Sequence, residues 1–434
     1  MKKIKRILSV ILCLPFAFLL CSCGKTAAAK ELKGAHDIER NSWHDLSDEG
    51  YKDFLTDVSA FSAKFSENYV KENGYSGENL AVSPLSVYMA LAMTSECANG
   101  KTQEEILSAL GITEEQATEY TSRLYAALSR TVKDRNKVIS TLKLTNSIWL
   151  SNEIEPNYET LGSLSDNYFC STYSADFLNK NAAANRALKD FVKKNTNGLI
   201  NSDFNLSKET LFALVNTLYL KDFWKEFGSL NYSEKVYTFA SEDGSESKTK
   251  FLESNYSVGR AHEGENYRTF FAKTNNGYKV KFIVPKDGVS VTDVFTKEVL
   301  QEVNTLSDYA AIDGNTRYNT RCIFPKFTAD CDADLVPVLR ALGVNDLFER
   351  SCDMSALTLE DVCCDKVIHK AKLSADEDGI EGAAVTIVSI KCMSAAPEHY
   401  EEVFEDFVVD KSFAYLVTDS ADVVLFSGII SSAS

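Results

Sequence analysis

Few side chains in this sequence have the types and spacing that catalysis requires. The chain of 434 residues has only five histidines, which are His36, His44, His262, His369 and His399. None of them lies in an H-E-x-x-H zinc motif, and the sequence contains no G-x-S-x-G nucleophile turn and no nucleotide-binding glycine loop. Ser76 lacks the flanking glycine spacing of a nucleophile, and the acidic run 376–378 is typical of a solvated loop. The residues therefore predict no catalytic site, metal or cofactor, and we do not expect an enzyme.

The cysteines point to no metal or redox centre either. Eleven are present, and no two are spaced as C-x-x-C, which argues against a zinc ribbon or a thioredoxin-type site. Some of them could pair in an exported chain, but their connectivity stays open at this stage. Adjacent Cys363 and Cys364 are not expected to bond to each other because a vicinal disulfide strains the backbone.

The most informative segment is 375–396, which has the residue alternation of a strand but begins and ends with residues typical of a loop. Every second residue from Ile380 to Ile390 is apolar or small, whereas the intervening set begins with Glu381 and ends with Lys391. This alternation is typical of a strand with one buried face. The segment nevertheless opens in an acidic, glycine-containing stretch and closes in Ser-Ala-Ala-Pro. It therefore has the properties of a loop able to enter a β-sheet, and an ordinary strand and hairpin is the alternative.

The elements that must position this segment change in character along the chain. Helical spacing of apolar residues predicts helices at 51–71, 84–95, 103–111, 114–130 and 184–194. Strands are predicted at 79–82, 211–220, 278–284, 321–327, 367–373, 415–418 and 423–426. Helices first and strands later, without βαβ alternation, favour an α+β fold.

Composition narrows the class of partner. The chain is 44% hydrophobic and 25% charged, as in folded globular proteins, and carries a formal net charge of −16. A chain this acidic, without a basic stripe, is a poor ligand for a phosphate backbone, so we expect no nucleic-acid partner.

The N-terminus predicts export. A basic start, MKKIKR, precedes the apolar run Ile7–Leu20, which is too short to span a bilayer and has the length of a signal-peptide core. Leu20-Cys21-Ser22-Cys23 resembles the lipobox of bacterial lipoproteins, which implies lipidation of Cys23. We expect a signal peptide at 1–22, an anchor and spacer at 23–46, and one domain at 47–434. The protein would be anchored by lipid on the extracellular face of a bacterial cell membrane, or secreted if an ordinary signal peptidase cleaves it.

Eight sequence blocks occur in an order known from one family. They are NLAVSPLSVYMALAM (79–93), CANGKTQEEILSALG (97–111), FVKKNTNGLI (191–200), LVNTLYLKDFW (214–224), FPKF (324–327), LGVNDLF (342–348), VIHKA (367–371) and VLFSG (424–428). Over roughly 350 residues they resemble the serpins, a family of serine protease inhibitors. The resemblance implies a helix-rich N-terminal part, three β-sheets and an exposed reactive-centre loop at about 377–400.

Within this resemblance, EDGIEGAAVT (377–386) is similar to the serpin hinge E-E-G-T-E-A-A-A-A-T. The matching residues are Glu377, Gly379, Glu381, Ala383, Ala384 and Thr386. Ile380 replaces the usual threonine and Gly382 an alanine. Because inward-facing residues must become buried when the loop inserts, a charge or a proline would oppose insertion. Ile380 is bulky but apolar, and Gly382 lowers only the strand propensity, so we expect a competent hinge.

The resemblance also implies the bond that a protease would attack. Counting 17 residues from Glu377 places it between Met393 and Ser394. An unbranched apolar methionine suits elastase- or chymotrypsin-like serine proteases, which we expect to be trapped as acyl-enzymes when the loop inserts. A register shifted by two residues would present Lys391 to trypsin-like enzymes instead. Cys392, next to this bond, allows a thiol-dependent variant of the activity.

The family pattern assigns a further set of polar and aromatic residues to the control of sheet opening. Ser83, Asn216 and His369 would form a hydrogen-bonded cluster that holds the sheet, and Trp224 belongs to the same region. An ordinary buried core histidine is the alternative for His369. We expect a monomer. The competing functions are a non-inhibitory serpin-fold binding protein, a transporter substrate-binding lipoprotein and, less favoured for lack of a nucleophile motif, a secreted hydrolase.

Overall fold

The structure is a computed structural model that describes residues 28–37, 44–134, 137–224, 229–306, 312–313, 315–364, 366–381 and 401–433. Its helices are α1 (Glu49–Asn73), α2 (Pro84–Cys97), α3 (Gly100–Leu110), α4 (Glu114–Leu128), α5 (Tyr158–Tyr168), α6 (Phe177–Asn195), α7 (Val291–Val294), α8 (Lys297–Thr305) and α9 (Val336–Ala341), followed by the 3-10 turn η1 (Asp346–Phe348). Its strands are β1 (Ala29–Lys33), β2 (Leu80–Val82), β3 (Arg130–Asp134), β4 (Lys137–Ser151), β5 (Cys170–Ala175), β6 (Phe212–Phe223), β7 (Asn231–Ala240), β8 (Glu246–Glu253), β9 (Ser257–Val258), β10 (His262–Glu263), β11 (Tyr267–Lys273), β12 (Lys279–Pro285), β13 (Ile312–Asp313), β14 (Thr316–Phe324), β15 (Phe327–Asp334), β16 (Ile368–Ala375), β17 (Gly379–Glu381), β18 (Glu401–Val408), β19 (Phe413–Thr418) and β20 (Val424–Ile430).

Local signals explain where the first helices begin. Asp48 caps α1 by accepting a hydrogen bond from the Tyr51 backbone N–H, and Ser83 caps α2 with Pro84 at the first helical position. Helix α1 buries Phe54, Val58, Phe61 and Phe65, and α2 is buried along nearly its whole length. Both helices were predicted from their spacing, and the structure confirms them.

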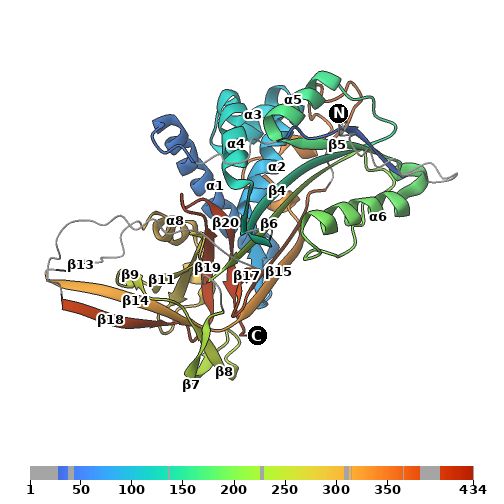
Figure 1. The fold of residues 1–434 in the computed structure, drawn as a ribbon. Helices are drawn as coiled ribbons and strands as arrows, with labels where there is room; N and C mark the ends of the chain where they lie inside the picture. The colour runs from blue at the N-terminus through green and yellow to red at the C-terminus, as the bar shows by residue number, and fades with distance from the viewer. Residues whose placement is uncertain are drawn as a thin grey trace, which may run out of the picture.

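A long sheet forms the centre of the molecule (Figure 1). Its strand order is β1-β5-β4-β6-β17-β16-β15-β2-β20-β19-β12-β11-β10, with β3 paired to β4. One parallel pair, Asp330 with Leu80, joins β15 to β2, so the sheet divides at that point into two parts. A second sheet has the order β13-β14-β8-β7, and β14 also pairs with β18 and β9. These three parts match the three sheets that the resemblance implied.

Helices cover both faces of the long sheet around β6, and residue alternation shows which face each one covers. Val215 and Ala213 pack in a cluster with Phe177 and Leu188 of α6. The alternate residues of β6, such as Leu218, pack into the main core, to which α1 and α2 contribute. The side chains of β6 therefore alternate between the α6 cluster and the main core.

Several strands lie where the sequence analysis had none. Strand β4, fifteen residues long, and strand β1 both belong to the long sheet. Strand β1 lies inside the segment 23–46, which was interpreted as a spacer, and pairs with β5. The single strand predicted at 321–327 is in fact the end of β14 and the start of β15, because Pro325 between them has no backbone N–H to donate.

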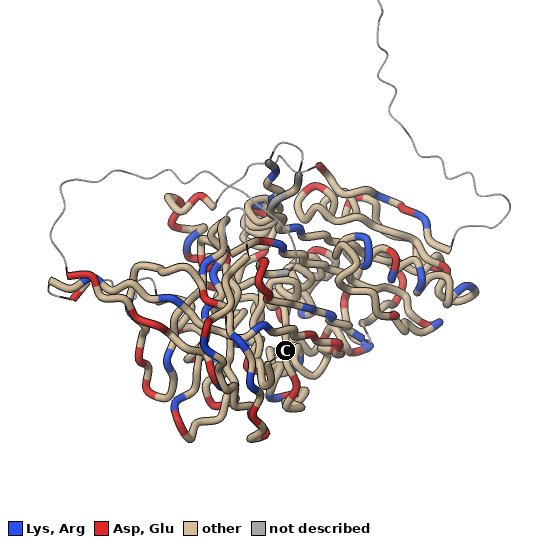
Figure 2. Tube along the Cα trace, turned by 60° about the horizontal axis from the view of Figure 1, so that its bottom comes forward, with Lys and Arg blue, Asp and Glu red and all other residues tan. Residues whose placement is uncertain are grey.

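The charges are distributed as the composition suggested. Figure 2 shows basic and acidic residues interspersed along the chain rather than gathered in a basic stripe. Among the described residues, no helix combines the length and the apolar character needed to cross a membrane.

Candidate functional site

The segment singled out in the sequence begins inside the long sheet. After β16 the chain turns through 376–378 and returns as β17, which lies between β16 and β6. Ile380 pairs with Ala375 on one side and with Asp222 on the other, antiparallel to both strands. Its side chain is fully buried. The Ile380 substitution in the hinge is therefore compatible with burial in the sheet.

Hydrogen bonds fix the turn that leads into β17. The Asp376 carboxylate accepts from the backbone N–H groups of Asp378 and Gly379, at 2.9 and 3.2 Å. The indole N–H of Trp224 donates to the Asp376 carbonyl at 2.6 Å, and the Trp224 ring packs edge-on against Phe324. Trp224 therefore anchors the start of the hinge at the end of β6.

Two further contacts tie the hinge to the body. The Glu377 carboxylate lies 3.1 Å from the Lys326 ammonium. Its pKa is lowered, first by a bond from its own backbone N–H and then by Lys326. Gly379 meets a steric requirement, because a Cβ at this position would lie 2.0 Å from the Asp222 carbonyl oxygen. Only glycine allows β17 to approach β6 this closely.

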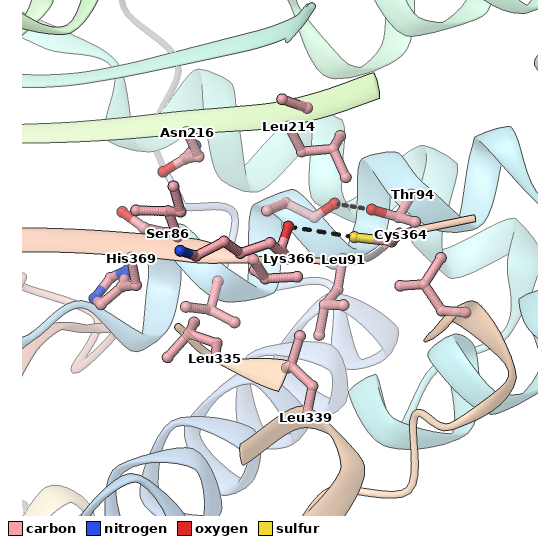
Figure 3. A pocket seen from close by; sticks show the side chains of 16 residues that line it. Ser86, Leu91, Thr94, Leu214, Asn216, Leu335, Leu339, Cys364, Lys366 and His369 are labelled. Carbon is pink, nitrogen blue, oxygen red and sulfur yellow. Dashed lines mark hydrogen bonds between the residues drawn. The ribbon is translucent and has the colours of Figure 1, made fainter. Parts of the chain in front are cut away.

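Below β17 the described strands β6 and β16 have no pairing with each other, and a small cavity of about 50 Å³, partly open to solvent, lies beside the gap. Figure 3 shows its walls: Leu214 and Asn216 come from β6, Lys366 and His369 from the β16 segment, and Ser86, Leu91 and Thr94 from α2. A second cavity, lined by Val192, Thr217 and Lys370 among others, lies on the α6 side of the same strands.

Asn216 and His369 face this gap, and Ser83 lies next to the histidine. The imidazole Nε2 of His369 accepts the Ser83 backbone N–H at 3.1 Å, which assigns the proton to Nδ1. Burial lowers the pKa of His369 to about 4, so the ring is neutral at physiological pH. The Ser83 hydroxyl donates to the Leu425 carbonyl at 2.8 Å.

Asn216 has a different partner from the one expected. Its amide donates to the Asn146 side-chain oxygen, and its own Oδ1 is buried without a hydrogen-bond partner among the described residues. The expected cluster therefore exists as a Ser83–His369 pair with Asn216 nearby on the same cavity. Asn146 in β4 was missed because that strand was not predicted from the sequence.

The other predicted site residues lie outside the described residues. These are Gly382, Ala383, Ala384, Thr386, Met393, Ser394 and Cys23, and the side chain of Glu381 is likewise not described. Among the described cysteines, including adjacent Cys363 and Cys364, no disulfide is present.

Comparison with known proteins identifies this arrangement. The family model "Serpin (serine protease inhibitor)" matches residues 56–433. The chain belongs to the serpin family. Human neuroserpin is 25% identical over 371 residues, which cover 81% of this chain and 85% of neuroserpin. Iripin-1 of Ixodes ricinus is 27% identical over 366 residues, covering 82% of this serpin and 89% of iripin-1.

Solved structures show the same fold. The native state of the thermophilic serpin tengpin superposes with a TM-score of 0.72 at 23% identity, covering 94% of this serpin and all of tengpin. Thyroxine-binding globulin in complex with thyroxine gives a TM-score of 0.69 at 21% identity, covering 88% of this serpin and all of that chain. Strand β17 lies where the sequence resemblance predicts the hinge of the reactive-centre loop, at one end of the gap between β6 and β16.

Proposed function

We propose that this serpin inhibits elastase- or chymotrypsin-like serine proteases by inserting its reactive-centre loop between β6 and β16 after attack at Met393–Ser394. The description of the family, serine protease inhibitor, supports an inhibitory role. The observation that carries the proposal is the position of β17, which already pairs with both strands at one end of the gap.

The register of β17 can be continued into the gap. With Ile380 opposite Ala375 and Asp222, the same antiparallel pairing would place Thr386 opposite His369 and Asn216. It would place Val388 opposite Val367 and Leu214, which line the cavity. The residues on the Ile380 side of the inserted strand are then the apolar or small ones, so their burial is favourable.

Thr386 would also supply a missing hydrogen bond. The Asn216 Oδ1 atom is buried without a partner in the described residues, and Asn216 is the β6 residue that this register places opposite Thr386. A threonine hydroxyl can donate to such an oxygen, and satisfying a buried acceptor is favourable. Insertion would therefore fill an apolar cavity and satisfy a polar atom at the same time.

The chemistry follows from the order of events. The protease serine attacks the Met393 carbonyl carbon, the bond to Ser394 breaks, and the new amine leaves with a proton from the protease histidine. The acyl-enzyme then holds the protease on the end of a strand that is free to enter the gap. Insertion carries the protease away from its starting position and distorts its active site, so hydrolysis of the acyl bond fails.

Incubation of the protein with pancreatic elastase, chymotrypsin and trypsin tests this proposal. We expect an SDS-stable complex with elastase or chymotrypsin, together with a released C-terminal peptide whose mass shows that it begins at Ser394. A peptide beginning at Cys392 with trypsin would move the reactive bond to Lys391. Cleavage without a complex by all three proteases would instead support the non-inhibitory serpin alternative.

We also propose that Cys23 is lipidated and holds the inhibitor on the extracellular face of a bacterial membrane. The resemblance of Leu20–Cys23 to a lipobox supports this. The modified cysteine would then be the first residue of the mature chain. Metabolic labelling with a palmitate analogue in a bacterial host should label the wild type but not a Cys23→Ser variant. Equal labelling of both proteins would contradict the assignment.

A further inference from the structure

The second sheet carries a concentration of exposed apolar side chains. Strands β14 and β18 project away from the body of the molecule (Figure 1). Of the large apolar side chains exposed among the described residues, six lie in or beside this sheet: Tyr232, Val236, Tyr256, Val258, Ile312 and Phe404. Exposed apolar side chains that gather in one place mark interaction surfaces more often than scattered ones do.

Strand register places four of these side chains on one face. Val258 is opposite Asn319 of β14, and Asn319 is opposite Phe404 of β18, so Val258 and Phe404 point to the same side. Ile312 is opposite Arg317, two residues before Asn319 and therefore on that side as well. The Tyr256 ring contacts the Phe404 ring edge-on at 5.1 Å between centroids. We call the surface formed by Tyr256, Val258, Ile312 and Phe404 the β14/β18 face.

The charges on this face are paired with one another. Arg321 lies 2.7 Å from both Asp406 and Glu253, and its guanidinium packs 5.3 Å from the centre of the Tyr256 ring. Arg317 approaches Glu402 at 3.9 Å. Apolar side chains with paired charges around them resemble the centre and rim of a protein–protein interface. The arrangement favours a partner with an apolar contact surface over a strongly charged one.

The position of the face indicates which partner reaches it. Strand β18 begins at Glu401, seven residues after Ser394, and seven extended residues span at most about 25 Å. Phe404 lies about 10 Å further along β18. A protease domain of about 230 residues has a diameter of about 45 Å. A protease engaged at Met393–Ser394 is therefore large enough and close enough to contact the β14/β18 face.

We propose that the β14/β18 face is a second contact surface for the target protease, and that it binds an apolar surface of that protease outside the protease active site. This inference rests on the proposed function, since it names the partner that the loop engages. Contact on this face forms before the acyl-enzyme and leaves the gap between β6 and β16 untouched. It therefore raises the rate of complex formation without changing the number of inhibitor molecules consumed for each protease inhibited.

The test compares the wild type with a Tyr256→Ala/Phe404→Ala double variant. Both side chains are about half exposed, so we expect the variant to fold, which its melting temperature would confirm. Tyr158→Ala is the matched control, because Tyr158 is 60% exposed but lies on α5. With chymotrypsin or elastase, the double variant should associate at least about tenfold more slowly at unchanged stoichiometry, and the control should match the wild type.

Binding of chymotrypsin and elastase whose active-site serine is replaced by alanine separates this inference from the proposed function. The inactive proteases should bind the wild type more tightly than the double variant, even if no covalent complex forms with the active enzymes. Equal binding and equal association rates, a change in stoichiometry, or no binding of either inactive protease would each overturn the assignment. A dimer of the wild type that the double variant abolishes in sedimentation would assign the face to a second copy of the chain instead.

Discussion

Replacement of Ile380 by glutamate is the sharpest perturbation of the hinge. The Ile380 side chain is fully buried between β6 and β16, opposite Ala375 and Asp222. Its burial contributes about 2 kcal/mol, which glutamate would lose. Even a protonated carboxyl without a partner costs about 2 kcal/mol more in such a site. The sum, about 4 kcal/mol, corresponds to roughly a thousandfold lower ratio of docked to undocked hinge.

The neighbour of the new carboxylate at position 380 is another carboxyl group, not a cation that could neutralise it. Asp222, the pairing partner on β6, is itself fully buried, and burial raises its pKa. A second carboxyl beside it would raise the pKa of both groups further. Since the first step of insertion extends the pairing of β17, the same penalty would slow insertion after the protease has attacked.

The assay is the stoichiometry of inhibition with the protease that the wild type traps. Ile380→Glu should be cleaved at Met393–Ser394 and released as a substrate, with little SDS-stable complex. Ile380→Val, the matched control, keeps an apolar side chain and should still form the complex. If Ile380→Glu formed the complex at the wild-type stoichiometry, burial of the hinge at this position would not govern inhibition and the reasoning would be wrong.

Three other changes test separate parts of the structure. Met393→Arg should redirect inhibition to trypsin, and unchanged protease preference would show that the reactive bond lies elsewhere. Gly379→Ala should lower the free energy of unfolding by about 1–3 kcal/mol, because the new Cβ would lie 2.0 Å from the Asp222 carbonyl oxygen. The melting temperature should fall accordingly, and an unchanged melting temperature would contradict this contact. Burial lowers the pKa of His369 from its ordinary value of about 6.5 to about 4, so this histidine takes up a proton more readily in the unfolded chain. The free energy of unfolding, measured by urea denaturation, should therefore decrease by up to about 3 kcal/mol as the pH falls from 6.5 to 4. A His369→Asn variant should lack this part of the pH dependence.

The long sheet illustrates what was missed from the sequence. Strand β4 has an alternating set, Val138, Leu142, Leu144, Ile148 and Leu150, which was a usable signal for a strand. It lies between predicted helices and was overlooked, and Asn146, the partner of Asn216, was missed with it. Strand β1 has no comparable signal, since its AKELK sequence is polar and it becomes a strand by pairing with the edge of β5. Pairing at a sheet edge depends on a partner that is distant in sequence.

The hinge shows where sequence reasoning was sufficient. The alternation from Ile380 to Ile390 predicted one face suited to burial, and Ile380, the member of this set that the structure describes, is fully buried. The start of α2 was equally readable from Ser83 and Pro84, because helix capping is local. These features depend on side-chain type and on neighbours within a few residues.

The sequence by itself determined that the chain has an export signal pattern, serpin motifs in order, and a loop composed so that it can become a strand. Only the tertiary structure decided that β17 is already held between β6 and β16, that Asn216 turns to Asn146 and leaves its oxygen unpaired, and that Tyr256 and Phe404 share an exposed face. The physical reason is distance along the chain. Composition and periodicity report which surface a segment can bury, whereas the partner that buries it is more than a hundred residues away for β17 and β6, and its identity follows from the packing of the whole molecule.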